Sequence, residues 1–374
     1  MATSRRDFLK KSAIVGAAAV AAPVVLSGCT PDNNGRIDPV LGPGEPVNSP
    51  FQVSTNNNAI PITGTFLDEI SHDIPHQNWG PAEWEADFQN MKAIGIDTVI
   101  LIRAGHKKQI TYPSPYLISQ GCYRPHIDLL ELFLSLADKY GMCFYFGLYD
   151  SGYDSDNQDG YNPDDLKLYA ERNKYVIEEV WNNYATRHKS FGGWYLSCEI
   201  SRSTKGSVEL FHDMGKQCKD ISNNLPTFIS PWIDGKKSVS AASSTISQAE
   251  GVSVDEHERE WNEIFSGIHD VVDAVAFQDG HIDYDELDAF FSVNKKLADK
   301  YNMKCWTNAE SFDRDMPIKF LPIKFEKLAM KLEAAKRCNY DKAITFEFSH
   351  FMSPQSAYLQ AGHLHDRYKE YFNI

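Results

Sequence analysis

Short apolar runs alternate with longer amphipathic segments through most of this chain, and the alternation occurs eight times. The apolar runs, each predicted to be a β-strand, cover residues 62–70, 98–102, 143–149, 193–199, 227–232, 274–278, 304–310 and 343–348. In the intervening segments apolar residues recur at helical spacing, as at Phe325, Leu328 and Leu332. Because these connections are long enough for crossovers between parallel strands, the pattern predicts a single (β/α)8 barrel over residues 61–374.

A doubly wound open sheet is the alternative arrangement for alternating strands and helices. Such sheets usually carry a glycine-rich phosphate-binding turn after the first strand. Here that position holds the sequence Phe-Leu-Asp-Glu at residues 66–69, which contains no glycine. The barrel is therefore the favoured fold class.

The first 28 residues have the order of features found in an export signal. Arg5 and Arg6 precede an apolar stretch at residues 13–26, which is shorter than the roughly 20 residues that a membrane-spanning helix needs. The paired arginines are typical of twin-arginine export. The stretch ends in Leu-Ser-Gly-Cys, which resembles the lipobox of bacterial lipoproteins. We expect cleavage after residue 28 and lipidation of Cys29.

Residues 29–60 are rich in proline and asparagine and show no apolar periodicity, so we expect a flexible linker there. The whole chain has a formal net charge of −14. Removing residues 1–28 takes away four basic residues and Asp7, which leaves −17. An acidic protein is a poor partner for nucleic acid, whose phosphates need a basic surface. We expect a monomeric body tethered by its lipid to the periplasmic or cell-surface face of a bacterial membrane.

The cysteine count fits the same interpretation. Seven cysteines leave at least one without an intrachain partner, and Cys29 accounts for the odd one. Cys143, Cys198 and Cys305 fall on separate predicted strands. A large barrel does not need disulfides for stability, so we expect the remaining six to be mostly reduced.

Polar residues gather where the predicted strands end, which is where barrel enzymes place their active sites. In strand order these positions are Asp68 and Glu69, Arg103, Tyr149 and Asp150, Glu199, Trp232, Gln278 and Asp279, Glu310, and Glu347. Strand alternation predicts that Glu199 and Glu310 point inward. In the eighth strand it predicts that Thr345 and Glu347 point inward, while Ile344, Phe346 and Phe348 face the helices.

Glutamates at the ends of strands 4 and 7 resemble the catalytic pair of clan A retaining glycoside hydrolases. The body also resembles a family of uncharacterised glycosidase-like barrel lipoproteins of bacteria, in the segments 64–68, 193–199, 229–232 and 276–279. The resemblance implies that Glu199 is the acid/base and Glu310 the nucleophile. Clan A usually has an asparagine before the strand-4 glutamate, where it binds the sugar 2-hydroxyl. This chain has Cys198 there.

Two carboxyl groups suit glycoside cleavage because one protonates the leaving oxygen and the other attacks the anomeric carbon or activates water. The expected substrate is an oligo- or polysaccharide, and the expected outcome is retention. The other strand-end residues are predicted to bind it, namely Asp68, Glu69, Arg103, Tyr149, Trp232, Gln278, Asp279, Trp306 and Glu347. Core packing is the alternative for each aromatic residue, and ion pairing is the alternative for the two glutamates. A glycan-binding lipoprotein without catalysis is the competing function.

Other chemistries find less support. A metal-dependent barrel hydrolase would need a His-x-His pattern on the first strand, whereas His72 and His76 lie beyond its end and four residues apart. The chain has no Cys-x-x-Cys, P-loop or Gly-x-Ser-x-Gly motif. We therefore expect neither a catalytic metal nor another cofactor.

Overall fold

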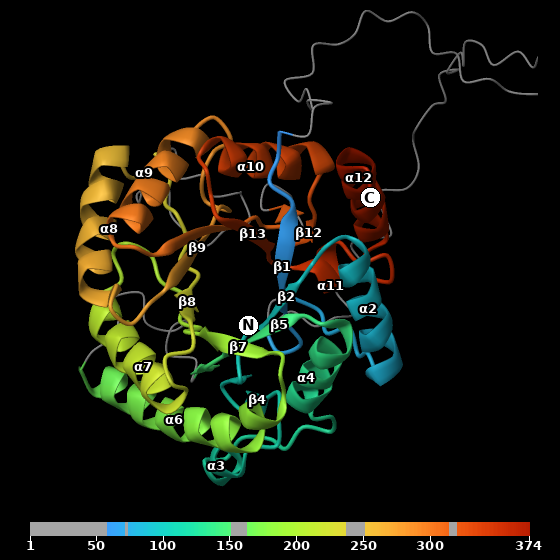
Figure 1. Ribbon diagram of the computed structural model, residues 1–374, viewed down its shortest axis with the longest axis vertical. Helices are drawn as coiled ribbons and strands as arrows, with labels where there is room; N and C mark the ends of the chain where they lie inside the picture. The colour runs from blue at the N-terminus through green and yellow to red at the C-terminus, as the bar shows by residue number, and fades with distance from the viewer. Residues whose placement is uncertain (1–57, 72–73, 151–162, 237–250, 314–319) are drawn as a thin grey trace, which may run out of the picture. The chain divides into compact units, whose positions relative to one another are not determined.

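The computed structural model describes residues 58–71, 74–150, 163–236, 251–313 and 320–374. Parallel strands close into a barrel in the order β1-β13-β10-β9-β8-β7-β5-β2 (Figure 1). Their bounds are β1 Ile62–Leu67, β2 Thr98–Leu101, β5 Cys143–Gly147, β7 Phe191–Tyr195, β8 Thr227–Ile229, β9 Ala274–Gln278, β10 Lys304–Asn308 and β13 Lys342–Thr345. Each lies within or next to one of the predicted runs. The predicted single (β/α)8 barrel is confirmed.

Long helices surround the barrel as an outer ring (Figure 1). They are α2 Pro81–Ala93, α4 Leu129–Tyr140, α6 Pro163–Asn183, α7 Ser207–Ile221, α8 Val254–Ile268, α9 Leu287–Lys300, α10 Phe325–Arg337 and α12 Leu359–Phe372. Helix α4 shows how local sequence sets their ends. The Asp128 side chain caps its first turn by accepting from Glu131 N, and Gly141 ends it in the left-handed conformation.

Side chains of the strands form two apolar layers, one inside the barrel and one between strands and helices. The inner layer comprises Phe66, Ile100, Ile102, Tyr145, Tyr195, Phe228, Ala274, Ala276 and Ile344. Around strand 4, Glu199 lines the cavity as the predicted alternation requires, and Tyr195 packs inside while Leu196 and Cys198 join the outer layer.

For strand 8 the predicted alternation is wrong at Ile344, Phe346 and Glu347, whereas Phe348 lies in the outer layer as predicted. Ile344 packs inside the barrel and Phe346 lines the cavity at its mouth, whereas Ala343 and Phe348 belong to the outer layer. Both faces of a barrel strand are buried in apolar surroundings, so hydrophobicity alone does not distinguish the inner face from the outer one.

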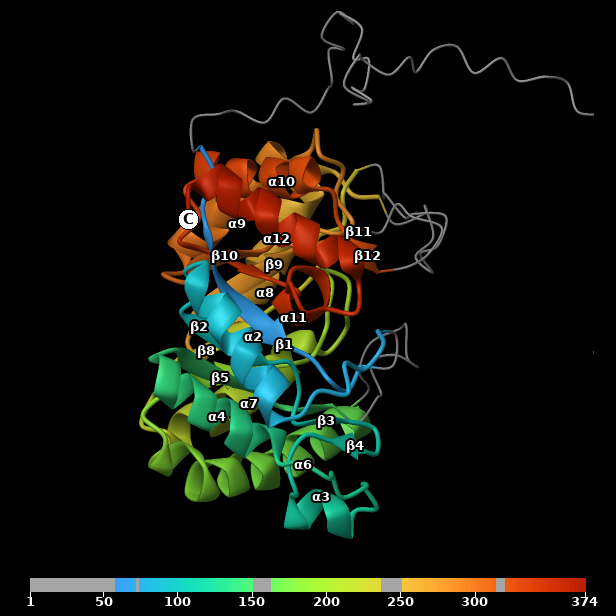
Figure 2. The same cartoon turned by 90° about the vertical axis from the view of Figure 1, so that its right-hand side faces the viewer.

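Short elements extend the C-terminal end of the barrel. Strands β3 Gly105–His106, β4 Gln109–Ile110 and β6 Tyr149–Asp150 form one small sheet, and β11 Phe312–Asp313 pairs with β12 Leu321–Pro322. Figure 2 shows β3, β4, β11 and β12 on the same side of the barrel. The structure also has two short helices, α3 Pro115–Ser119 and α11 Phe348–Phe351. These additions build walls above the strand ends.

The close approach of two strands beneath these walls requires a glycine. A Cβ atom on Gly147 would lie 2.3 Å from the carbonyl oxygen of Leu101 and 2.4 Å from that of Ile102. Any larger residue would push β5 away from the end of β2. The glycine thus keeps Arg103, which follows β2, close to Asp150, which follows β5.

The described body begins just before the predicted boundary at residue 61. Ala59 is buried, and Ile60 N donates to Leu332 O at 3.1 Å. The predicted signal peptide 1–28, Cys29 and most of the 29–60 linker lie outside the described residues. Within the described ranges, no helix has both the length and the apolar character needed to cross a membrane. Among the described residues, no disulfide bond joins the cysteines, which are Cys122, Cys143, Cys198, Cys218, Cys305 and Cys338.

Candidate active site

A cavity of about 240 Å³ opens at the C-terminal ends of the strands. Its polar lining consists of Ser71, Arg103, His106, Asp150, Glu199, Ser230, Gln278, Asn308 and Glu310. Its apolar and aromatic lining consists of Phe66, Ile74, Ile102, Tyr195, Trp232, Phe312, Phe320 and Phe346. Five of the residues predicted from the sequence, Arg103, Glu199, Trp232, Gln278 and Glu310, therefore share one cavity.

Glu199 lies at the accessible side of this cavity, with 43% of its side chain exposed. Its Oε1 accepts a hydrogen bond from Arg103 Nη2 at 3.0 Å. The Nη1 of the same guanidinium lies 3.3 Å from Asp150 Oδ2, and His106 Nδ1 lies 2.7 Å from that oxygen. One cation is thus divided between two carboxylates.

The buried position of Arg103 depends on this pairing. Burial by itself lowers the pKa of a guanidinium, but the carboxylates of Glu199, Asp150 and Asp68 outweigh burial and raise the pKa of Arg103. Arg103 is therefore a permanent positive charge at the cavity wall. The carboxylates of Asp150 and Glu199, from two different segments of the chain, hold its planar guanidinium group in place.

Glu310, in contrast to Glu199, is buried, with only 2% of its surface exposed. Its main chain is fixed by two neighbours, because Glu310 N donates to Asp279 Oδ1 at 3.2 Å and Lys331 Nζ donates to Glu310 O at 3.2 Å. Lys331 comes from α10, is itself 4% exposed, and donates to Asp279 Oδ1 at 2.7 Å. The Asp279–Lys331 pair thus anchors the end of strand 7.

Asp279 does not line the cavity, although the sequence placed it among the substrate-binding residues. Burial raises the pKa of Asp279 to about 6, and Glu310 adds to this, whereas Lys331 lowers it. The contacts of Asp279 are with Lys331 and the Glu310 backbone. In this structure Asp279 fixes the end of strand 7 and is not part of the cavity lining.

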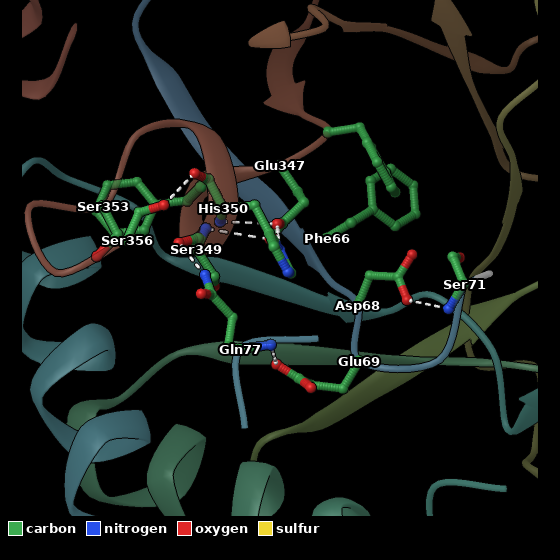
Figure 3. A network of polar contacts seen from close by, with 12 residues as sticks. Phe66, Asp68, Glu69, Ser71, Gln77, Glu347, Ser349, His350, Ser353 and Ser356 are labelled. Carbon is green, nitrogen blue, oxygen red and sulfur yellow. Dashed lines mark hydrogen bonds and ion pairs between the residues drawn. The ribbon is translucent and has the colours of Figure 1, made fainter. Parts of the chain in front are cut away.

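Glu347 is likewise fully buried and outside the cavity lining. Its carboxylate caps α11 by accepting from Ser349 N at 3.1 Å and His350 N at 2.8 Å (Figure 3). The Nδ1 of His350 also contacts this carboxylate. The strand-8 glutamate therefore ties the chain into α11 and does not face the cavity.

The ring of His350 contacts an acceptor at each nitrogen. Nδ1 contacts the Glu347 carboxylate, and Nε2 lies 2.8 Å from the carbonyl oxygen of Pro75. Both acceptors require an N–H, so this geometry selects the doubly protonated imidazolium. Burial opposes the charge, but Glu347, Asp68 and Glu69 outweigh it and raise the pKa of His350 to about 9.

Asp68 and Glu69 lie beside this pair, at the end of strand 1 (Figure 3). Asp68 Oδ1 accepts from Ile70 N and Ser71 N, both at 2.9 Å, and thereby shapes the turn that brings Ser71 to the cavity. Glu69 accepts from Gln77 N at 3.1 Å. Burial raises the pKa of Glu69 to about 7, with His350 opposing. Neither carboxylate is part of the cavity lining.

The three predicted aromatic contacts differ in their surroundings. Trp232 lines the cavity, with its ring 6.4 Å from that of His281. Trp306 packs inside the barrel, 5.4 Å from Phe228. Tyr149 donates to Lys107 O at 2.6 Å and belongs to the outer apolar layer. Trp232 is thus the one of the three that reaches the cavity.

Several lining residues were not predicted as site residues. Asn308 donates to Ser230 Oγ at 3.1 Å, and both side chains face the cavity. Asn308 could have been found, because it shares the inward face of strand 7 with Glu310. No sequence pattern identifies His106, Phe312 and Phe320, because they lie in short segments outside the strand–helix repeat.

The described residues contain no group of three or more His, Cys, Asp or Glu side chains placed to hold a metal ion. The cavity lining holds three carboxylates, namely Glu199, which is partly exposed beside Arg103, and Asp150 and Glu310, which are buried.

Residues 62–358 match the family described as Domain of unknown function (DUF4434). This chain belongs to that family. The matched residues include all eight barrel strands, from β1 to β13, and end just before α12. No match to the chain was found among curated proteins.

Two solved structures place this DUF4434 chain among known barrels. A "putative alpha-L-fucosidase" from Bacteroides thetaiotaomicron VPI-5482 is 71% identical, with a TM-score of 0.80, over 85% of this chain and 97% of that one. The endo-1,4-beta-D-mannanase of Thermotoga petrophila RKU-1 is 12% identical, with a TM-score of 0.51, over 83% of this chain and 99% of that one. The second likeness concerns the fold alone. The chain is a glycosidase-like (β/α)8 barrel.

Proposed function

We propose that this protein is a glycoside hydrolase in which Glu199 is the acid/base and Glu310 the nucleophile. The observation that carries the proposal is that both glutamates, from the ends of strands 4 and 7, line one cavity. Their exposures differ as the two roles require. An acid/base must reach the leaving group and water, whereas a nucleophile lies beneath the sugar ring.

The reaction then proceeds in two displacements. Glu199 gives its proton to the glycosidic oxygen while a carboxylate oxygen of Glu310 attacks the anomeric carbon, and the carbon–oxygen bond to the leaving group breaks. Glu199, now ionised, takes a proton from water. The resulting hydroxide displaces Glu310, which releases the sugar with net retention of configuration.

The 71% identical relative makes an α-L-fucoside the first substrate to test. The cavity volume of about 240 Å³ lies just below the range of roughly 300–1,000 Å³ that is common for ligand pockets. A space of this size favours one sugar unit over a long chain segment. We therefore propose that the enzyme removes single terminal residues.

The test is a screen for reducing-sugar release from aryl glycosides and glycans, followed by Glu199→Gln and Glu310→Gln. Each variant should lose at least about 100-fold in kcat/KM, because each removes a proton-transfer or nucleophilic group. Glu209→Gln, on the exposed face of α7, serves as the control and should keep full activity. Activity surviving in both site variants would refute the residue assignment, and NMR of the first-formed anomer distinguishes retention from inversion.

A non-catalytic glycan-binding protein is the second candidate. Cys198 belongs to the outer apolar layer and is absent from the cavity lining, so position 198 supplies no amide to a sugar 2-hydroxyl. Binding of a glycan by the wild type, without cleavage of any member of the panel, would establish this function in place of hydrolysis.

We also propose that the protein is an exported lipoprotein anchored through Cys29. The basis is the ordered signal at residues 1–29, and the test is membrane fractionation with fatty-acid labelling. Cys29→Ser should abolish labelling and release the protein from membranes, whereas Cys338→Ser should change neither. Labelled Cys29→Ser protein would refute the anchor.

A further inference from the structure

One side of the cavity is an apolar corner formed by Ile74, Phe312, Phe320 and Phe346. These four residues come from three separate segments, namely the loop after β1, the β11–β12 hairpin and the end of strand 8. They also pack on Phe351 and Tyr358 as a small apolar cluster of their own. The corner is therefore supported from behind and keeps its shape without a ligand.

The ring planes of this corner meet at steep angles. Phe312 and Phe320 have centroids 4.8 Å apart and planes at 76°, and Phe312 and Phe346 have centroids 6.0 Å apart and planes at 84°. A flat aromatic platform suits the face of a sugar ring. Rings set nearly at right angles instead enclose a small apolar group.

Among the described residues, the four side chains that form the corner offer no hydrogen bond to a hydroxyl group. None of these side chains carries a hydrogen-bonding atom, and a hydroxyl buried there without a partner would lose its hydration. The charged residues lie elsewhere in the lining, at Arg103, Asp150, Glu199 and Glu310. Three of those four are carboxylates, which also disfavours a sugar that carries its own carboxylate.

We infer that the apolar corner is a subsite for the methyl group of a 6-deoxyhexose, and that Phe312, Phe320 and Phe346 select it over the corresponding hexose. This rests on the proposed glycosidase function and deepens it. A 6-deoxyhexose has a methyl group where the common hexoses have a hydroxymethyl group, so it fills the corner without burying an unpaired hydroxyl. The rest of its ring remains available to the polar lining.

The test uses sugars that differ only at C6. Four matched pairs are L-fucose with L-galactose, L-rhamnose with L-mannose, D-fucose with D-galactose, and D-quinovose with D-glucose. Calorimetry measures binding of the free sugars, and 4-nitrophenyl glycosides of both anomers measure cleavage. In at least one pair we expect the 6-deoxy member to be favoured by about 10- to 100-fold, the range that an apolar pocket achieves against an added group.

Phe320→Asn tests the corner directly. Phe320 has a φ of 57°, a left-handed conformation that asparagine tolerates well, and asparagine adds hydrogen-bonding atoms. We expect the preference for the 6-deoxy member to fall about tenfold. Ile74→Thr adds a hydroxyl from another segment and should act in the same direction. Tyr358→Leu is the control, since it belongs to the same cluster but does not line the cavity.

The outcomes separate this inference from the proposed function. If both members of every pair bind or are cleaved equally, the apolar corner is not a methyl subsite. The proposed hydrolysis is not affected by that result. If the 6-deoxy sugars bind more tightly but no glycoside is cleaved, the methyl subsite is supported and the proposed hydrolase function is refuted. An unchanged preference in folded Phe320→Asn and Ile74→Thr overturns the assignment of the residues. Absence of binding and cleavage for all four pairs overturns the inference for 6-deoxyhexoses.

Discussion

The guanidinium of Arg103 contacts the Glu199 carboxylate at 3.0 Å, and it shares its charge with Asp150. Asp150 holds the other arm of the guanidinium, so the position of Arg103 beside Glu199 does not depend on Glu199 alone. The three residues come from the ends of strands 2, 3 and 4, which meet at the mouth of the barrel.

Asp150→Asn should lower the rate of hydrolysis. Asparagine keeps an oxygen acceptor but loses the charge that holds Arg103 Nη1, so the guanidinium is less firmly fixed beside Glu199. We expect kcat/KM to fall by about 10-fold, because the contact that orients the proposed acid/base is weakened. Steady-state rates at one fixed pH measure this loss.

The matched control is Asp138→Asn. Asp138 Oδ2 lies 2.8 Å from His188 Nδ1, as Asp150 contacts His106, but it belongs to α4 and not to the cavity. Its removal should leave kcat/KM unchanged. Full activity of a folded Asp150→Asn variant would contradict a positioning role for Asp150.

Lys331→Met should destabilise the barrel at the end of strand 7. Lys331 is almost completely buried against Asp279, and its loss leaves a buried carboxylate without a cation. We expect the free energy of unfolding to fall by about 3–5 kcal/mol, measured by urea denaturation. The double variant Lys331→Met with Asp279→Asn should recover part of that loss, because the uncompensated charge is gone. Equal loss in the single and double variants would show that packing, not charge, dominates.

Asp87→Asn should stabilise the protein at neutral and alkaline pH. Asp87, on α2, accepts from Ser353 Oγ at 2.5 Å, and burial raises its pKa to about 6 from an ordinary 3.8. The folded state binds this proton more tightly than the unfolded state. The resulting stability is fully present below pH 3.8 and is lost as pH rises through 6.

Asparagine removes this ionisation cost while keeping an oxygen acceptor for Ser353. The stabilisation relative to wild type should therefore grow by up to about 3 kcal/mol between pH 4 and pH 8. Urea denaturation at both pH values measures it. Asp270→Asn, at an exposed position, should show no such trend, and a flat difference for Asp87→Asn would disprove the buried ionisation.

His350→Gln should show its largest destabilisation at slightly acidic pH. The pKa of His350 is raised from 6.5 to about 9, so its contribution is fully present below pH 6.5 and is lost as pH rises through 9. Glutamine keeps one donor but not the charge beside Glu347. We expect a loss of about 3 kcal/mol at pH 6 that shrinks toward pH 9.5, from urea curves at each pH.

His365→Gln provides a control of opposite sign. Burial lowers the pKa of His365, and Lys369 adds to the lowering, so the folded state favours the neutral ring. Its stability contribution is lost as pH falls, and the substitution should therefore be least harmful at acidic pH. The same trend in both variants would contradict the imidazolium assigned to His350.

The residues of the candidate site show how far strand-end reasoning reaches. Glu199, Glu310 and Arg103 follow different strands and line one cavity, because the parallel strands of a barrel all end at the same mouth. Their place after a strand does not distinguish them from Asp68, Asp279 and Glu347, which also follow strands. Those three carboxylates are used to accept backbone N–H groups or to pair with a buried cation.

The sequence alone determined the barrel, because helical and strand periodicities and the length of the connections are local properties of the chain. It also determined which residues follow each strand. Only the tertiary structure decided which face of strand 8 points inward, since both faces are apolar. It also decided the partners of each strand-end carboxylate, because Lys331, His350 and the walls at His106 and Phe320 lie on other elements. Charge pairing and enclosure depend on distances in space, which a linear pattern does not encode.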